Sequence, residues 1–101
     1  MAVTPEGKVK KVVKQTLDDM GIYHFSPFQA GMGRAGIPDI IACYNGRFVA
    51  FECKAGNNQP TALQEREINE IRKAKGLAFV INETNMYEIK ELLQWMHTPP
   101  S

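Results

Sequence analysis

The sequence predicts one α/β domain whose elements follow the order helix, three strands, helix, strand, helix. Two stretches place apolar residues at helical spacing behind capping residues, one after Thr4 and one after Thr61. Asn45-Gly46 stands between two apolar runs, which is the strongest short signal for a β-hairpin. The 101 residues are the length of one domain, so we expect a single domain over residues 1–101.

The first helix is expected to begin at Thr4, with Pro5 in its first turn, and to end at Gly21. Glu6 suits the positive end of the helix dipole. Glu6 lies three residues before Val9, the first inward-facing residue, so its side chain should project from the buried face. That face is formed by five apolar residues, Val9, Val12, Val13, Leu17 and Met20.

The remaining elements are bounded by glycine, proline and capping residues. We expect strands at residues 22–28, 38–44, 47–54 and 77–82, a flexible loop at 29–36, and helices from 61 to about 75 and from a cap at Asn85 and Glu88 to about 97. The aromatic residues of the first strand, Tyr23, Phe25 and Phe28, are expected to pack within the sheet. The apolar surface of the last helix suits either the core or a dimer interface.

Composition limits the possible functions. The formal net charge is +1, so a surface for nucleic acid must come from local clustering of basic residues. No apolar run reaches the roughly 18 residues that span a membrane, and the loop at 29–36 lacks the ending of a nucleotide-binding P-loop. We therefore expect neither a membrane nor a nucleotide cofactor as partner. Cys43 and Cys53 lack metal-type spacing, which favours a reducing, cytoplasmic setting.

The hairpin register brings two acidic residues together. A two-residue turn pairs Tyr44 with Arg47, and counting outward from that pair places Asp39 opposite Glu52. Opposed residues have Cβ atoms about 4.5–5.5 Å apart, and like charges there destabilise a sheet. A bound divalent cation would resolve this conflict, and carboxylate oxygens suit hard ions such as Mg²⁺ or Mn²⁺.

Strand alternation adds an amine to this pair of acids. Glu52 and Lys54 share a face of the sheet, whereas the side chain of Cys53 points away. The Lys54 ammonium could align the attacking water or stabilise charge that develops on a phosphate. The backbone carbonyl of Cys53 could be a further metal ligand. The same alternation puts Cys43 and Cys53 on opposite faces, which argues against a disulfide between them.

Each candidate also has an ordinary structural explanation. A single acid or lysine at a strand end is usually solvated or ion-paired, and only the register makes Asp39, Glu52 and Lys54 a candidate catalytic centre. Glu6 is a favourable first-turn residue in any helix. Gln64 pairs with Thr61 in a capping box. The residues alone therefore leave the roles of Glu6 and Gln64 open.

Pro38-Asp39 followed by Glu52-Cys53-Lys54 resembles the PD-(D/E)XK nuclease signature. Within that superfamily the chain is similar to a stand-alone VRR-NUC (virus-type replication-repair nuclease) domain, and the resemblance runs from residue 6 to about residue 80. The motifs that carry it are Gly36-Ile37-Pro38-Asp39-Ile40-Ile41, Phe48-Val49-Ala50-Phe51-Glu52-Cys53-Lys54 and Thr61-Ala62-Leu63-Gln64.

This resemblance implies a restriction-endonuclease-like αβββαβ core, with a mixed sheet flanked by helices, followed here by a C-terminal helix. It implies Mg²⁺- or Mn²⁺-dependent hydrolysis of DNA phosphodiester bonds, with Asp39 and Glu52 holding the metal and Lys54 supporting the water. Glu6 corresponds to the first-helix acid, a ligand either directly or through water, and Gln64 to a helical glutamine beside the site. Short stand-alone members, often phage-borne, are similar to Holliday-junction resolvases and act as homodimers, which implies a bacterial or phage-infected host cell.

The expected contacts with DNA are basic side chains near this site. Arg34 lies in the glycine-rich loop that leads to Asp39, where the backbone could approach a phosphate. Lys8, Lys11 and Lys14, together with Lys10, form a basic stripe on the first helix. Lysines on helix surfaces often serve solubility alone, and Arg72, Lys73 and Lys75 suit the C-terminus of their helix.

The sequence hypothesis is a metal-dependent, structure-selective DNA endonuclease that resolves four-way junctions as a homodimer. One alternative is a nicking or flap nuclease without preference for junctions. A second alternative is a DNA-binding module that kept the fold and lost catalysis, and a third is a purely structural phage protein.

Overall fold

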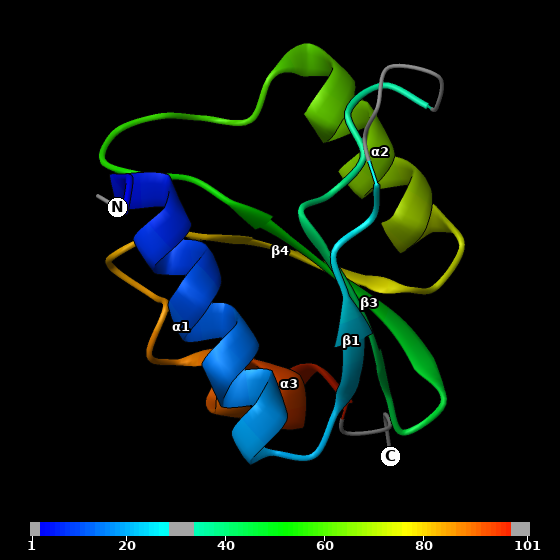
Figure 1. The fold of residues 1–101 in the computed structure, drawn as a ribbon. Helices are drawn as coiled ribbons and strands as arrows, with labels where there is room; N and C mark the ends of the chain where they lie inside the picture. Colours follow the sequence, from blue (N-terminus) through cyan, green and yellow to red (C-terminus); the bar gives the residue numbers. More distant parts are fainter. Residues whose placement is uncertain (1–2, 29–33, 98–101) are drawn as a thin grey trace.

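The computed structural model describes residues 3–28 and 34–97 (Figure 1). Its elements are α1 (Pro5–Asp19), β1 (Tyr23–Phe25), β2 (Ile40–Tyr44), β3 (Arg47–Cys53), α2 (Ala62–Lys73), β4 (Leu77–Ile81) and α3 (Ile89–His97). The strands form one sheet in the order β1-β2-β3-β4, antiparallel except for the parallel pair β3–β4. The predicted α/β class, with a mixed sheet flanked by helices in the predicted order, is confirmed.

Helices cover both faces of the sheet. On one face α1 and α3 enclose the main core, in which Leu17, Phe51 and Leu93 are fully buried. On the other face Ile68 of α2 packs against Ala50 of β3 and Ala78 of β4. β3 lies between β2 and β4, so its last residues are covered from all sides and an ionisable group placed there is buried. Among the described residues, no helix has the length and apolar character needed to cross a bilayer.

The predicted local signals form as expected. The Thr4 side chain accepts a hydrogen bond from the Gly7 N–H, and Pro5 occupies the first turn of α1. Asn45 and Gly46 have φ angles of 50° and 80°, as a two-residue hairpin turn with two left-handed positions requires. The register Tyr44↔Arg47, Cys43↔Phe48 and Ile41↔Ala50 is confirmed. It determines which side chains meet at the open end of the hairpin.

The first strand differs from its prediction. β1 covers three residues only, and Tyr23 and Phe25 are 70% and 47% exposed. Packing of these residues and of Phe28 within the sheet is therefore a wrong prediction, because α2 covers β3 and β4 rather than the edge strand. Their cross-strand neighbours share this face, and we call the group the open sheet face: Tyr23, Phe25, Ile41, Cys43 and Phe48.

The start of the last helix also differs. α3 begins at Ile89, and the side chain of Asn85 does not cap it. The Asn85 carboxamide instead accepts from the Asn82 N–H and donates to the Val80 carbonyl, so it closes the turn after β4. Ile89 and Leu93 of α3 are buried while Trp95 is exposed, so the helix has one core stripe and presents Trp95 outward. Tyr87, in the turn before the helix, is also exposed.

Candidate active site

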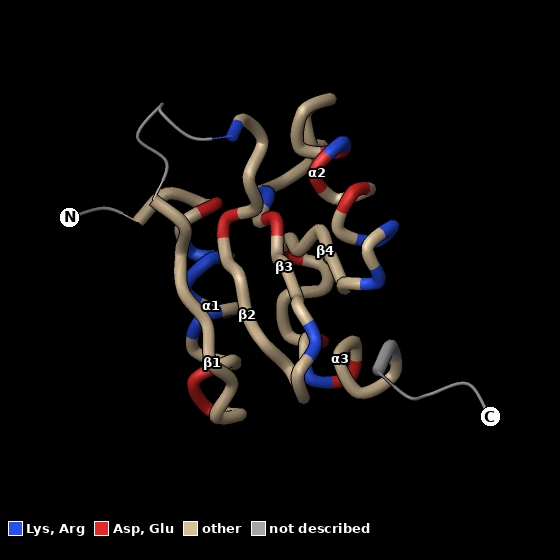
Figure 2. The backbone as a smooth tube through the Cα atoms, turned by 90° about the vertical axis from the view of Figure 1, so that its right-hand side faces the viewer, with Lys and Arg blue, Asp and Glu red and all other residues tan. Residues whose placement is uncertain are grey.

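The two acidic residues of the hairpin meet at its open end, where Figure 2 shows acidic positions side by side at the ends of β2 and β3. The backbone ladder ends at Ile40↔Phe51, one pair before the expected pair of Asp39 and Glu52. The next hydrogen-bonded pair would need a donor at Pro38, and proline has no N–H. Asp39 Oδ2 instead accepts a hydrogen bond of 2.8 Å from the Cys53 N–H. A side chain thus continues the ladder and fixes one carboxylate oxygen beside Glu52.

Gly36 brings the loop before Asp39 against the start of α2. Its φ is 78°, and a Cβ atom at this position would lie 2.5 Å from the Leu63 carbonyl oxygen. Such a contact is forbidden to any other residue type without a shift of backbone. The glycine therefore permits the close approach that sets Asp39 and Gln64 around the same space.

Glu52 is the most buried acid of the site, with 3% of its surface exposed. Its Oε2 accepts a hydrogen bond of 3.2 Å from Gln64 Nε2 and lies 3.9 Å from Lys54 Nζ. Its Oε1 is buried and has no hydrogen-bond partner among the described residues. Burial, and then the neighbouring Asp39 carboxylate, raise the pKa of Glu52 to about 8, although Lys54 opposes the shift. A buried anionic oxygen without a partner is costly, so this one suits a cation or a proton shared with Asp39.

Gln64 serves the helix and the site with different atoms. Its Oε1 accepts from the Thr61 N–H at 2.9 Å, and its N–H donates to the Thr61 hydroxyl, which completes the predicted capping box. Its Nε2 donates to Glu52. Membership of the capping box and a position beside the candidate site are therefore compatible for Gln64. The capping hydrogen bonds orient its amide toward Glu52.

Lys54 is held beside Glu52 by the parallel strand pair. Its N–H donates to the Ile81 carbonyl at 2.8 Å and continues the β3–β4 pairing beyond Cys53. Its side chain is only 11% exposed, so the ammonium stays next to the acids. The side chain of Cys53 points into the main core, as alternation predicted. Burial, and then the Asp39 charge, raise the pKa of the Cys53 thiol to about 12, which leaves its carbonyl as the candidate ligand.

Glu6 reaches the site through a lysine. Lys10 Nζ lies 3.7 Å from Glu6 Oε2 and 3.4 Å from Asp39 Oδ1. Burial lowers the pKa of Lys10, but Asp39 and Glu6 outweigh it and the net shift is upward. From the sequence, Lys10 is predicted only as part of the basic stripe of the first helix. Its spacing of four from an inward-facing Glu6 was the available signal.

The residues present fit a divalent cation. Among the described residues, no group of three or more His, Cys, Asp or Glu side chains could hold a metal by itself. Magnesium, however, needs only one or two carboxylates when waters and substrate phosphate oxygens complete its shell. Asp39 and Glu52 supply two carboxylates, and the Cys53 carbonyl directly follows Glu52 in the chain. Glu52 Oε1 supplies a buried oxygen that has no donor among the described residues.

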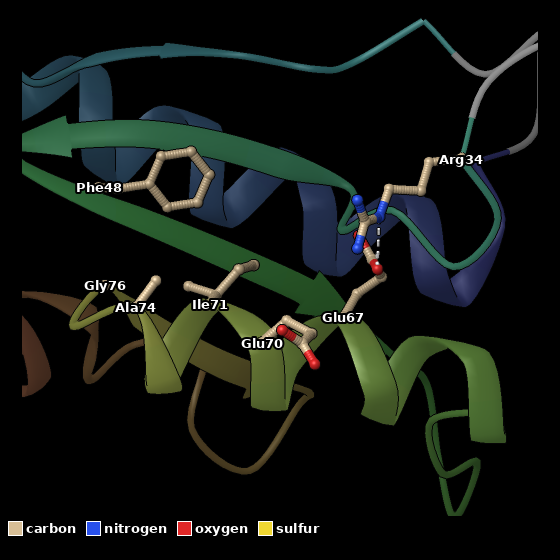
Figure 3. A pocket seen from close by; sticks show the side chains of 7 residues that line it. All are labelled: Arg34, Phe48, Glu67, Glu70, Ile71, Ala74 and Gly76. Carbon is tan, nitrogen blue, oxygen red and sulfur yellow. Dashed lines mark hydrogen bonds and ion pairs between the residues drawn. The ribbon is translucent and has the colours of Figure 1, made fainter.

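The predicted DNA contacts fall into two groups. Lys8, Lys11 and Lys14 are exposed on α1. The Arg34 guanidinium instead donates to Glu67 Oε2 of α2 at 2.7 Å, at the end of an open groove of about 340 Å³ between Phe48 and α2 (Figure 3). Arg34 is still exposed, so a phosphate contact stays a prediction. Arg72 donates to the Ala78 carbonyl, in line with a structural role for that helix end.

One comparison with known proteins identifies related sequences. Residues 12–90 match the family model described as archaeal Holliday junction resolvase (Hjc). The matched segment contains Asp39, Glu52, Lys54 and Gln64, and it begins after Glu6 and Lys10. No curated protein matches the chain. The match supports the PD-(D/E)XK type of nuclease and does not confirm the finer VRR-NUC assignment.

Proposed function

The chain belongs to the archaeal Holliday junction resolvase family, whose members are nucleases of branched DNA, and we propose that it resolves four-way junctions by metal-dependent phosphodiester hydrolysis. The metal would be Mg²⁺ or Mn²⁺, held by Asp39, Glu52 and the Cys53 carbonyl. Glu6 would join this shell directly or through a water. The observation that carries the proposal is Glu52 Oε1, a buried acid oxygen beside Asp39 and Lys54 that has no hydrogen-bond partner in the described part of the chain. Placement in the VRR-NUC branch is part of the same proposal.

The described side chains have distinct tasks in this reaction. A bound divalent ion would supply Lewis-acid assistance and a more acidic water. The Cys53 N–H holds the Asp39 carboxylate, and the Gln64 amide holds Glu52, so neither acid must reorganise before the reaction. The Lys54 ammonium, close to Glu52, would orient the attacking water or neutralise charge that develops on the phosphate. Lys8, Lys11, Lys14 and Arg34 would contact the DNA backbone.

We further propose that the active form is a homodimer. Symmetric cleavage of a four-way junction needs two centres, and each chain has one candidate centre within its described residues. The open sheet face supports self-association because it exposes aromatic and sulfur-containing side chains and contains no charged residue. Tyr23, Cys43 and Phe48 of this face lie near the hairpin turn, whereas the acids lie at its open end. Pairing through the turn end of this face would therefore leave the acids accessible to DNA.

The test compares labelled four-way, flap, nicked and linear duplex DNA with Mg²⁺, with Mn²⁺ and with chelator. We expect cleavage of the four-way junction at symmetric positions, loss of cleavage in chelator and loss in Asp39→Asn. Equal cleavage of flaps or nicked duplexes would show that the protein is a nuclease without preference for four-way junctions. Tight binding of the junction without cleavage would instead indicate a DNA-binding module, and metal-independent cleavage would remove the proposed centre.

A further inference from the structure

Lys10 of α1 contacts two carboxylates of the candidate site at once. Its ammonium lies 3.4 Å from Asp39 Oδ1 and 3.7 Å from Glu6 Oε2. It lies outside the segment that matches the family model, which begins at residue 12. Geometry alone therefore assigns it to the site.

Both oxygens of Asp39 have partners in this structure. Oδ2 accepts from the Cys53 N–H, and Oδ1 pairs with Lys10. The Cys53 N–H belongs to a strand with partners on both sides, so it cannot withdraw without loss of sheet structure. The Lys10 ammonium ends a flexible four-carbon chain that is 35% exposed, so it can leave.

The second lysine of the site, Lys54, is less exposed than Lys10 and less free to move. Lys54 is 11% exposed and its main chain is bonded to Ile81, which holds it beside Glu52. Removal of Lys54 would leave a buried acid uncompensated. Removal of Lys10 would free Glu6, whose side chain is 42% exposed, and Asp39, whose side chain is 15% exposed and keeps its hydrogen bond from the Cys53 N–H.

We propose that Lys10 is a positioning residue that acts as an internal substitute for the metal. In the metal-free protein its ammonium holds Asp39 and Glu6 in place and neutralises them. A divalent cation that uses Asp39 must displace this ammonium, so Lys10 lowers the affinity of the site for metal. This inference rests on the proposed function only in placing the cation at Asp39.

Calorimetric titration with Mn²⁺ in the absence of DNA tests this role. We expect Lys10→Met to bind Mn²⁺ on the order of tenfold more tightly than the unmodified protein, because one competing positive charge within about 4 Å of the ligand is removed. Lys90→Met is the matched control, since Lys90 is an exposed lysine of α3 with no part in the proposed site, and its Mn²⁺ affinity should not change. Lys10→Arg keeps the charge and should bind Mn²⁺ much as the unmodified protein does.

Thermal unfolding gives a second readout that is independent of cleavage. In chelator the melting temperature of Lys10→Met should fall, because Asp39 and Glu6 lose their shared counter-ion. Saturating Mn²⁺ should then raise that temperature by more than it raises the temperature of the unmodified protein. If Lys10→Met is unfolded in chelator, Lys10→Gln, whose amide can still donate to Asp39, takes its place in both measurements.

The outcomes separate this inference from the proposed function. Equal or weaker Mn²⁺ binding by Lys10→Met overturns the role of Lys10, even if the unmodified protein cleaves junctions. Tighter binding that persists when Asp39→Asn is added also overturns it, because the metal would then lie elsewhere. If neither protein binds Mn²⁺, the metal centre of the proposed function fails, and the role of Lys10 fails with it.

Discussion

The two ends of the β2–β3 hairpin are built by different means. At the turn end, Asn45 and Gly46 adopt left-handed angles, the ladder is regular, and the side chains around it are largely exposed. At the open end the ladder stops, and groups from four other segments complete the structure: the side chains of Lys10 and Gln64, the backbone at Gly36 and the Ile81 carbonyl. Local sequence rules thus determine one end, whereas tertiary contacts determine the end that we assign to catalysis.

The largest expected effect is at the open end. Glu52→Gln keeps the shape and the contact with Gln64 but removes the charge, so single-turnover cleavage of a four-way junction should fall by about 10³-fold or more. The control is Glu88→Gln, an exposed acid remote in sequence from the site, which should cleave at the unmodified rate. Retention of full activity by Glu52→Gln, with normal circular dichroism, would remove Glu52 from the mechanism.

Two glycine substitutions compare the ends directly. Gly36→Ala forces a left-handed angle and a Cβ atom 2.5 Å from the Leu63 carbonyl, so the free energy of unfolding in urea should fall by roughly 3 kcal/mol. Gly46→Ala has an equally left-handed φ of 80°, but no atom of residues 3–28 or 34–97 lies within 4 Å of the added Cβ, so this variant should lose about 1 kcal/mol. Equal losses would show that the approach of the loop to α2 is not needed.

The turn end should matter for assembly and not for chemistry. Phe48→Ser, on the open sheet face and one pair from the hairpin turn, should weaken the proposed homodimer about tenfold, measured as the dissociation constant in sedimentation equilibrium. Trp95→Ser on the outward side of α3 is the comparison, because that helix was the alternative dimer surface. A larger increase of the dissociation constant for Trp95→Ser would show that the dimer forms through α3 instead.

The last expected effect is a pH dependence of the metal-free protein. The folded pKa of Glu52 is raised to about 8 from an ordinary value of 4.5, so the folded state binds a proton that the unfolded state releases. In chelator, the resulting stability is fully present below about pH 4.5 and is lost as the pH rises through about 8. Urea unfolding at a series of pH values should show this fall in the free energy of unfolding, and the fall should be absent in Glu52→Gln. A flat profile in the unmodified protein would show that Glu52 is ionised throughout.

The same contrast explains how much the sequence could predict. The caps at Thr4 and Thr61 and the hairpin register depend on neighbours within a few residues, and the sequence predicted them. The early end of the ladder at Ile40 could have been inferred from Pro38, which cannot donate. The contact of Lys10 with Asp39 depends on how α1 lies over the sheet, and no local pattern encodes that.

The errors have a related cause. Three aromatic residues in and after a short strand suggested burial, but α2 is too far across the sheet to cover them. The in-chain partner of Arg34 was missed because Glu67 is 33 residues away and becomes its neighbour only when the loop meets α2. The functional roles of Asp39, Glu52, Lys54, Glu6 and Gln64 stay predictions, now with a geometry against which to test them.

The peptide unit of Cys53 connects the interior of the protein to its acids. Its thiol is fully buried in the main core, while its N–H grips Asp39. A larger or smaller side chain at this position would shift the main chain on which Asp39 depends, without itself reaching solvent or DNA. A substitution at position 53 could therefore change the rate of the proposed reaction from within the core.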